Sequence, residues 1–126
     1  WAKRYAIPLK RPEINKPERA NAGFYGMRPG EEVAYMRAVW KRLWGAGEDV
    51  STDAALAGVA AEIRWETAAY LAACAAPANA AKLADATRAA TAAGIFGVPM
   101  VVVGEAMFWG NDRLDFVEEH LKSLSS

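Results

Sequence analysis

Apolar residues recur at helical spacing through the middle of the chain, and the first such run starts at Glu31. Pro29-Gly30 precedes the run, acidic residues occupy its first turn, and glycines follow it at Gly45 and Gly47, as expected for the two ends of one helix. The apolar positions lie three or four residues apart, at Val33, Met36, Trp40, Leu43 and Trp44. The pattern predicts an amphipathic helix from Glu31 to these glycines.

A second helix is predicted after a short polar segment. Ser51 or Thr52 is its candidate N-cap, because the side-chain oxygen of either residue can accept a hydrogen bond from the first turn. The apolar stripe of this helix comprises Leu56, Val59, Ala60 and Ile63. A third, shorter helix is predicted from Glu66 to Ala75.

The fourth predicted helix runs from Ala78 to Ala93. Pro77 occupies the first-turn position that tolerates proline, and Gly94 can close the helix as a left-handed cap. The abundance of Ala agrees with helix, because 20 of the 28 Ala residues lie between residues 54 and 93. About residues 28–93 are therefore predicted to form an all-helical layer.

After Gly94 the helical spacing gives way to an unbroken apolar and β-branched run, comprising Val98, Met100, Val101, Val102 and Val103. This composition predicts a strand buried on both faces. Gly104-Glu105 predicts a two-residue hairpin connection to a short partner strand at 106–109. A final helix follows Gly110-Asn111, with an apolar face of Leu114, Val117, Leu121 and Leu124. About residues 94–126 are thus predicted to form a ββα unit.

Closely spaced prolines dominate the start of the chain, at Pro8, Pro12 and Pro17. Each Pro removes a hydrogen-bond donor and restricts the residue before it, so no helix is expected in the first twenty residues, and Ile7 to Asn15 are predicted to be extended or loop. The opening segment WAKRYAIPL is typical of a helix end that continues into an extended segment. We therefore expect the sequence to start in mid-domain, with the N-terminal part of the domain absent.

The charges are unevenly distributed although the formal net charge is zero. Residues 1–44 carry ten Lys and Arg against four Asp and Glu, while residues 45–126 carry five against eleven. The basic residues form no continuous run of the kind that binds phosphate backbones, so no nucleic-acid partner is expected. Basic residues near an anionic small ligand explain the bias equally well.

Length and composition exclude several protein classes. The chain of 126 residues fits one domain. Its longest uncharged stretch, Thr67 to Ala81, has 15 residues and contains Pro77, so no membrane-spanning helix is predicted. Cys74 is the single cysteine, which excludes an internal disulfide, a CxxC pair and a cysteine-based zinc site, and no metal site is expected. No signal peptide is visible, and the cytoplasm is the expected location.

The segment GIFGVPMVVVGEAMFWGNDR, residues 94–113, is the most informative part of the sequence. Pro99 lies one residue into the predicted strand, where it removes a ladder hydrogen bond. A cis Val98–Pro99 bond is one resolution, because it turns the chain and leaves the backbone N–H and C=O of Val98 free to face a site. An extended peptide ligand could then pair with these groups as an added strand.

This segment resembles a known family. Val98-Pro99 is similar to the cis-Pro dipeptide of the thioredoxin superfamily, and FWGNDR resembles the FWGxDR signature of 2-hydroxychromene-2-carboxylate isomerases, to which kappa-class glutathione transferases are similar in this region. Upstream, AVWKRLWGAGEDVSTDAALAGVAAEI resembles the family's helix, Gly-rich turn and following helix start. The resemblance implies an α/β, thioredoxin-like (DsbA-like) fold with an all-helical insertion layer, of which residues 1–126 form a single partial domain.

The resemblance also implies a glutathione site. The backbone of Val98, next to Pro99, would pair with the cysteinyl part of glutathione. The γ-glutamyl end would be held by Trp109, Gly110, Asn111 and Asp112. Physical chemistry agrees, because a helix N-terminus favours a carboxylate, Asp112 can accept from an ammonium group, and Arg113 can pair with Asp112 or reach a carboxylate. The alternative is that Asp112 only caps the last helix.

Other candidate residues have competing interpretations. The family's Ser that contacts the glutathione sulfur lies in the absent N-terminal part, so no catalytic residue is predicted in this chain. Asn21 lies where the family often places a substrate contact, and the alternative is a turn residue before a helix. Trp40, Trp44 and Trp65 are interpreted as core residues, and the alternative is that they line a pocket for an aromatic substrate. Cys74 is interpreted as a small apolar filler and His120 as a solvated surface residue.

Three functions stay open. The first is a glutathione-dependent isomerase of the 2-hydroxychromene-2-carboxylate type, or a kappa-class-like transferase, that acts on a small aromatic carboxylate by reversible addition of glutathione. The second is a DsbA-like dithiol oxidoreductase, which shares the fold but needs a CxxC pair. The third is a non-catalytic truncated module that acts through a partner chain. Missing strands would leave an exposed sheet edge and an apolar helical face, so a homodimer is expected.

Overall fold

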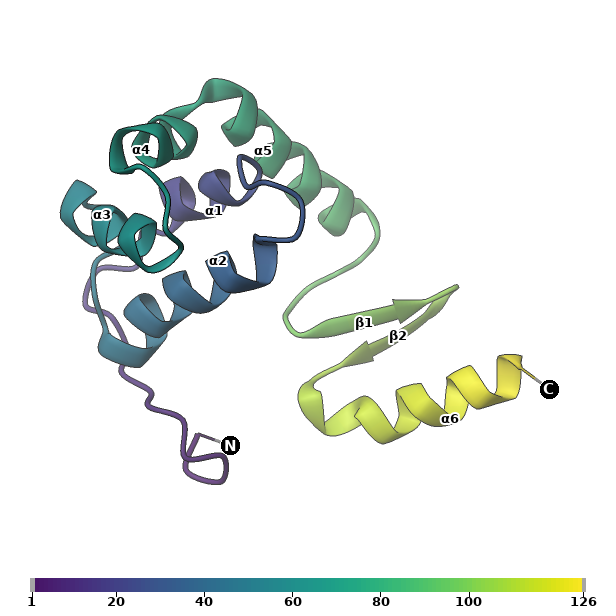
Figure 1. Ribbon diagram of the computed structural model, residues 1–126. Helices are drawn as coiled ribbons and strands as arrows, with labels where there is room; N and C mark the ends of the chain where they lie inside the picture. Colours follow the sequence, from purple (N-terminus) through teal and green to yellow (C-terminus); the bar gives the residue numbers. More distant parts are fainter. Residues whose placement is uncertain (1, 126) are drawn as a thin grey trace. The chain divides into compact units, whose positions relative to one another are not determined.

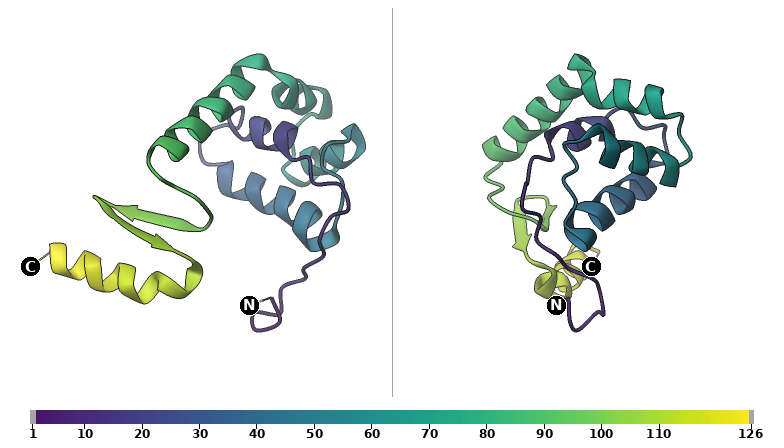
Figure 2. Two further views of the ribbon diagram at one scale, coloured as in Figure 1. Left: turned by 180° about the vertical axis from the view of Figure 1, so that it is seen from behind. Right: turned by 90° about the vertical axis from the view of Figure 1, so that its left-hand side faces the viewer.

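The computed structural model describes residues 2–125, and Trp1 and Ser126 lie outside the described residues. The chain divides into two compact units, residues 1–86 and residues 87–126, which we call the helical unit and the hairpin unit. Figure 2 gives two further views of the elements in each unit. The interpretation of residues 1–126 as a single partial domain stays a prediction.

Helices follow one another through residues 18–92 (Figure 1). Their bounds are α1 Glu18–Phe24, α2 Glu32–Trp40, the π-helix η1 Lys41–Ala46, α3 Asp53–Glu62, α4 Thr67–Ala75 and α5 Pro77–Ala92. Each of the four helices predicted in this region is confirmed. Among residues 2–125, no helix is long and apolar enough to cross a membrane.

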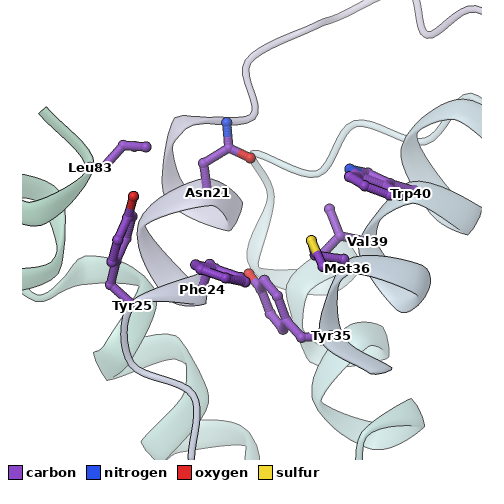
Figure 3. Close-up of a pocket in the computed structure, with 8 residues that line it drawn as sticks. All are labelled: Asn21, Phe24, Tyr25, Tyr35, Met36, Val39, Trp40 and Leu83. Atoms are coloured by element: carbon purple, nitrogen blue, oxygen red, sulfur yellow. The ribbon is translucent and has the colours of Figure 1, made fainter. Parts of the chain in front are cut away.

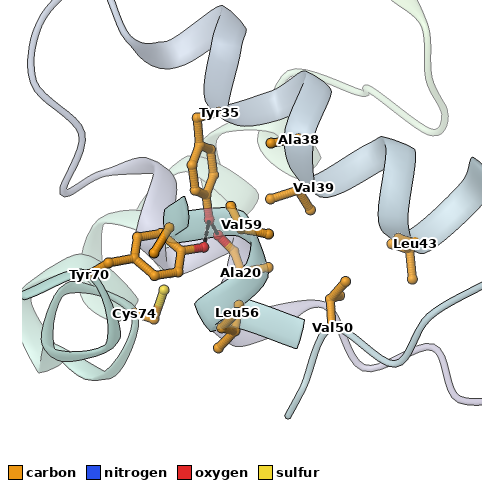
Figure 4. Packing of buried hydrophobic residues seen from close by; sticks show 11 residues of the cluster. Ala20, Tyr35, Ala38, Val39, Leu43, Val50, Leu56, Val59, Tyr70 and Cys74 are labelled. Carbon is orange, nitrogen blue, oxygen red and sulfur yellow. Dashed lines mark hydrogen bonds between the residues drawn. The ribbon is translucent and has the colours of Figure 1, made fainter. Parts of the chain in front are cut away.

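The core of the helical unit lies where α1 packs along α4 and where α2 and α3 close around them. Figure 4 shows the large side chains at its centre, and Tyr70, Leu56, Val50 and Val59 are fully buried. Burial of an aliphatic side chain of this size stabilises the fold by about 1.5–3 kcal/mol. The small buried residues Ala20, Ala38 and Ala60 let the helices approach closely.

Two buried tyrosines, Tyr35 and Tyr70, form hydrogen bonds within this core. The hydroxyl of Tyr35 donates to the backbone carbonyl of Ala20, and the hydroxyl of Tyr70 donates to that of Tyr35 over 3.2 Å. Burial raises the pKa of both hydroxyls and of the Cys74 thiol beside them. Cys74 is buried, as its interpretation as a small filler predicts, and a Cβ on Gly23 would lie 2.7 Å from its sulfur.

Side-chain caps fix the starts of α3 and α4. The Thr52 hydroxyl accepts from the backbone N–H of Ala55 over 3.2 Å, so Thr52 is the N-cap of α3. The Glu66 carboxylate accepts from the N–H groups of Ala68 and Ala69 at 2.9 and 2.7 Å, which caps α4. Local sequence therefore determines where both helices begin.

The prediction that the first twenty residues contain no helix was wrong, because α1 begins at Glu18 directly after Pro17. This helix has seven residues and no side-chain cap, and it buries Ala20, Ala22 and Gly23 rather than a stripe of large apolar residues. Asn21 lies inside α1, so its interpretation as a turn residue before a helix was also wrong.

The predicted apolar stripe packs into the core only in part, because Leu43 is buried whereas the two tryptophans are not. Tyr35, Ala38 and Val39 are buried, whereas Trp40 and Trp44 are 54% and 39% exposed. The core interpretation of these two tryptophans was therefore wrong, while Trp65 is partly buried and packs against the core. The helix also continues as the π-helix η1, which ends where Gly47 adopts a left-handed conformation with φ 71°.

The hairpin unit begins within α5, which Gly94 closes with φ 76° as predicted. Strands β1 (Met100–Val103) and β2 (Ala106–Trp109) pair antiparallel, with Met100 opposite Trp109 and Val103 opposite Ala106. The two-residue connection at Gly104-Glu105 is confirmed, and Gly104 has the positive φ of 59° that such a turn requires. The expectation of a strand buried on both faces was wrong, because Val102 is 45% exposed.

A 3₁₀ turn, η2 (Asn111–Arg113), joins β2 to α6 (Leu114–Leu124). The final helix is confirmed, and Val117 is its buried residue. The other members of its predicted apolar face are exposed, at Leu114, Leu121 and Leu124. Within the hairpin unit, α6 therefore has a large apolar surface that its own hairpin leaves uncovered.

Residues 2–7 form the hydrogen-bond pattern that is typical of the C-terminus of an α-helix. The N–H of Ile7 donates to the carbonyl of Ala2 over 3.0 Å, the N–H of Ala6 donates to that of Lys3 over 3.4 Å, and Ala6 is left-handed with φ 51°. This arrangement is a Schellman motif. Residues 7–12 then run without helix or strand, which confirms the predicted extended segment for that stretch.

Candidate functional site

The turn that follows β2 forms a hollow of about 280 Å³ in the hairpin unit, lined by Trp109, Gly110, Asp112 and Arg113. The turn is held to the residue before β1, because the N–H of Gly110 donates to the carbonyl of Pro99 over 3.0 Å. Gly110 has φ 103°, and a Cβ there would collide with a carboxylate oxygen of Asp112. The left-handed backbone conformation favours glycine at this position, and a larger residue would also displace the carboxylate of Asp112.

A carboxylate and a guanidinium lie side by side at this hollow. Asp112 and Arg113 form an ion pair of 3.9 Å, and both side chains are about half exposed, at 55% and 53%. The Arg113 guanidinium also lies 5.6 Å from the centre of the Phe116 ring. Charges of both signs that are exposed in this way can bind a ligand that carries an ammonium and a carboxylate group.

The backbone donors at the start of α6 are not capped by a side chain. Neither η2 nor α6 has a side-chain cap hydrogen bond, so the alternative interpretation of Asp112 as a simple helix cap gains no support. The first N–H groups of a helix favour negative charge when no side chain satisfies them. Asn111 begins η2 and does not line the hollow.

The peptide bond between Val98 and Pro99 is cis, as the sequence suggested. Val98 is 87% exposed, and its backbone forms no hydrogen bond within residues 2–125. Both backbone groups are therefore available to an extended ligand. They lie on the chain directly before Pro99, whose carbonyl holds Gly110.

Phe96 is a neighbour of this site that sequence reasoning missed. Its ring packs edge-on against Trp109 with centroids 5.4 Å apart, and a Cβ on Gly97 would lie 2.9 Å from the indole nitrogen of Trp109. Phe96 and Gly97 therefore pack closely against the Trp109 ring. An aromatic residue followed by glycine, two residues before the Val98-Pro99 bond, was the available signal.

The helical unit contains a separate hollow of about 210 Å³, which we call the aromatic slot. Figure 3 shows the side chains that surround it, which are Asn21, Phe24, Tyr25, Tyr35, Met36, Val39, Trp40 and Leu83. They come from α1, α2, α5 and the residue that follows α1. No charged side chain lines the slot, so it suits a flat apolar group.

Asn21 contributes the amide group of the aromatic slot. It projects from α1 between Leu83 and Trp40 (Figure 3), and its side chain is exposed. An amide at this position can donate or accept a hydrogen bond with a substituent on a bound ring. The structure therefore places Asn21 in the helical unit, while the other predicted ligand contacts belong to the hairpin unit.

Neither Cys74 nor His120 has the surroundings of a catalytic group. Burial raises the pKa of the Cys74 thiol, which disfavours the reactive thiolate. His120 is half-buried rather than solvated, and its ring packs on Phe108 with centroids 5.6 Å apart. Across residues 2–125, no three His, Cys, Asp or Glu side chains lie close enough together to hold a metal ion.

The sequence has well-defined relatives. Residues 1–122 match the DSBA-like thioredoxin domain family. The chain is 34% identical to a 2-hydroxychromene-2-carboxylate isomerase of Sphingobium xenophagum, over 96% of this chain and 63% of that protein. It is 32% identical to an isomerase of the same name from Pseudomonas putida, over 98% of this chain and 62% of that protein.

Structural similarity agrees with these matches. A solved structure of selenomethionine 2-hydroxychromene-2-carboxylate isomerase is similar with a TM-score of 0.87 and 32% sequence identity. The similarity covers 99% of this chain and 62% of that one. The chain thus spans less than two thirds of the length of these relatives.

Proposed function

Because the chain belongs to the family of DsbA-like thioredoxin domains, we propose that it binds the glutathione and the substrate of a glutathione-dependent isomerase. The proposed reaction is that of the 2-hydroxychromene-2-carboxylate type, in the breakdown of aromatic compounds. The relatives that carry this name support the proposal, since they align over nearly the whole chain. The observation that carries it is the turn Trp109–Arg113, with its paired charges and uncapped helix start.

Glutathione fits the groups that this turn presents. Its γ-glutamyl end carries an ammonium and a carboxylate, which match Asp112 and the free N–H groups near Asn111, with Arg113 within reach of the carboxylate. Its peptide backbone matches the free N–H and C=O of Val98, beside Pro99. Trp109 and Gly110 shape the hollow that receives the ligand. These seven residues are our proposed glutathione contacts.

The chemistry that bound glutathione would supply is reversible addition of its thiol to a conjugated double bond, which permits rotation about the resulting single bond before release. Atoms and electrons balance without an oxidant, because the product is an isomer of the substrate. The chain's own part is to bind and orient. In the hairpin unit, the turn would hold the γ-glutamyl end. In the helical unit, Asn21 is the proposed contact of a small aromatic carboxylate.

The test is conversion of 2-hydroxychromene-2-carboxylate by the natural full-length protein, followed by absorbance with and without added glutathione. The proposal predicts conversion only when glutathione is present, and a lower rate in Trp109→Ala, which removes the wall of the hollow. Val33→Ala is the control, because Val33 is exposed on α2 and lines neither hollow. Conversion that is independent of glutathione contradicts the proposal.

A second candidate function rests on the exposed apolar residues of the hairpin unit. Leu114, Leu121 and Leu124 of α6 and Val102 of β1 are all more than 40% exposed. An apolar helix face next to a short sheet is typical of a surface that another polypeptide covers. The chain would then act as a non-catalytic module, for which we propose a homodimer. Light scattering that gives a dimeric mass, together with glutathione binding but no conversion, would favour this function.

A further inference from the structure

A second hollow of the helical unit, of about 250 Å³, is lined by the segment that joins α1 to α2, the segment that joins α3 to α4, and the first turns of α4. We call it the arginine hollow, and its lining comprises Arg28, Arg64, Trp65, Glu66 and Ala69. None of these five residues lines the aromatic slot or the hollow at the turn after β2. The arginine hollow is therefore separate from the proposed glutathione and substrate contacts.

Two neighbours hold the Arg28 guanidinium in one orientation. It lies 4.9 Å from the centre of the Trp65 ring, and its Nε and Nη2 atoms lie 3.0 and 2.8 Å from the two carboxylate oxygens of Glu31. The indole N–H of Trp65 donates to the same carboxylate over 2.8 Å. These hydrogen bonds lower the pKa of Glu31, so its carboxylate is ionised at neutral pH. Because Glu31 engages one edge of the guanidinium, the N–H donors on Nη1 stay available to a ligand.

Arg64 brings a second guanidinium to the arginine hollow. Its side chain is exposed, and within residues 2–125 its guanidinium forms no ion pair or hydrogen bond. The backbone of Arg64 is left-handed with φ 59°, at the end of α3 where the N–H of Trp65 donates to the carbonyl of Ala60 over 2.9 Å. This is the position of a Schellman motif that favours glycine, so an arginine there is costly to the fold. The side chain thus offers donors that the fold itself does not use.

The charges of the lining favour an anion with several oxygen atoms. Glu66 is the one carboxylate of the lining, and its two oxygens accept from the N–H groups of Ala68 and Ala69 over 2.9 and 2.7 Å. The free donors therefore come from two guanidiniums on different segments. A carboxylate occupies one guanidinium fork, whereas a phosphate group has three terminal oxygens and can accept from two guanidiniums at once. The hollow has room for such a group, because one water molecule takes about 30 Å³.

We propose that the arginine hollow binds a phosphate group, either free phosphate or the head of a small phosphate monoester, between the Nη1 edge of Arg28 and the guanidinium of Arg64. Glu31 and Trp65 are positioning residues in this site, because they orient Arg28. The proposal goes beyond the proposed function and does not depend on it. Conversion of the substrate and binding of phosphate can therefore each fail without the other.

An NMR titration of the natural full-length protein, labelled with ¹⁵N at tryptophan, tests this proposal. The reporter is the indole N–H of Trp65, because it donates to the carboxylate that also holds Arg28, and its signal is identified by its loss in Trp65→Phe. The probes are inorganic phosphate, ethyl phosphate and acetate, added at constant ionic strength and at a pH above the second pKa of the phosphate monoester, about 6. We expect saturable shifts with both phosphates and at least about tenfold weaker binding of acetate.

Three variants distinguish a specific site from general attraction of anions. Arg64→Gln should weaken the binding of both phosphates by at least about tenfold. Arg37→Gln is the matched control, because Arg37 is also an exposed arginine of the helical unit and does not line the arginine hollow, and it should leave the affinities unchanged. Arg64→Gly should abolish binding and raise the melting temperature by about 2–4 °C, because glycine adopts the left-handed conformation without strain.

The relative affinities of the two phosphates identify the source of the ligand. Tighter binding of ethyl phosphate supports a site for a phosphate monoester, and tighter binding of inorganic phosphate supports a site for the free ion. Equal affinities for phosphate and acetate would overturn the proposal, as would a reporter signal that does not shift or identical effects of Arg64→Gln and Arg37→Gln. A lower melting temperature in Arg64→Gly would also contradict it, because the arginine would then serve the fold.

Discussion

The helical unit and the hairpin unit hold their apolar side chains in opposite ways. In the helical unit Leu56, Val59 and Tyr70 are completely buried, and α1, α2, η1, α3 and α4 contribute to one core. Among the described residues of the hairpin unit, Val117 is the one buried side chain of α6, while Leu114 and Leu121 are 56% and 48% exposed. The helical unit is thus specified by packing, and the hairpin unit by the local chemistry of its turns.

The helices differ in how their first N–H groups are satisfied. Side chains of Thr52 and Glu66 satisfy those of α3 and α4, whereas no side chain does so for α1, α2 or α6. A helix start that is satisfied internally contributes to stability, and one that is left open can bind an anionic group.

The largest expected effect tests the difference in packing. Leu56→Ala should lower the free energy of unfolding by about 2–5 kcal/mol, because it leaves a cavity in a fully buried site. Leu121→Ala, the matched change in the hairpin unit, should cost less than about 1 kcal/mol because that side chain is 48% exposed. Urea denaturation followed by circular dichroism measures both. Equal losses would show that α6 is packed as tightly as α3.

The next effect concerns the candidate ligand turn. Asp112→Ala should weaken glutathione binding by more than tenfold, about 1.4 kcal/mol, because it removes the acceptor for the ligand's ammonium group. Asp115→Ala is the control, since Asp115 is an exposed acid in the first turn of α6 and does not line the hollow. Unchanged affinity in Asp112→Ala, measured by calorimetry, would refute the assigned role.

A smaller effect is expected at a capped helix start. Thr52→Ala should lower the free energy of unfolding by about 1 kcal/mol, because the N–H of Ala55 loses its side-chain partner. Thr67→Ala should have little effect, since Thr67 follows the Glu66 cap and is exposed. Thermal denaturation of the two variants compares them directly. A larger loss for Thr67→Ala would contradict the capping account.

The smallest effect is a dependence of stability on pH. Hydrogen bonds from the N–H groups of Ala68 and Ala69 lower the pKa of Glu66 below its ordinary value. A lowered pKa in the folded state means that the ionised carboxylate stabilises the fold at neutral pH, and that this contribution is lost as the pH falls through the folded pKa. Glu66→Gln should therefore make the acid-induced decrease in stability shallower. Urea titrations at several acidic pH values test this, and an unchanged slope would contradict it.

Elements with strong local signals were predictable from the sequence. Thr52, Pro77 and Gly94 mark helix ends through capping and backbone geometry, and Gly104-Glu105 marks the hairpin. These signals act over a few residues, so they do not depend on the rest of the fold. The DsbA-like fold itself was predictable because FWGNDR, Val98-Pro99 and the upstream helical segment together resemble its family, which residues 1–122 match.

Features that depend on packing between distant segments were not predictable. The helix α1 was missed because its buried residues are Ala20, Ala22 and Gly23, which form no recognisable apolar stripe. Trp40 was assigned to the core because its spacing matched a helix face, yet α2 buries the neighbouring face that carries Tyr35 and Val39. The choice between two apolar faces is made by the partner helices, which one helical pattern does not reveal.

The candidate site was also predictable where it is local in sequence and not where it combines distant helices. The turn residues Trp109, Gly110, Asp112 and Arg113 are consecutive or nearly so, and the structure brings them to one hollow. The aromatic slot depends on α1, α2 and α5 together, and sequence reasoning identified only Asn21 and the possibility of a tryptophan wall. Residues such as Leu83 and Met36 carry no chemical signal of their own.

The most direct test of the account compares two thiol ligands by calorimetry on the same preparation. One is glutathione, and the other is cysteinylglycine, which lacks the γ-glutamyl group that the turn Trp109–Arg113 is proposed to hold. The account predicts saturable binding of glutathione and at least about tenfold weaker binding of cysteinylglycine. Equal affinities for the two ligands, or no binding of glutathione, would contradict it.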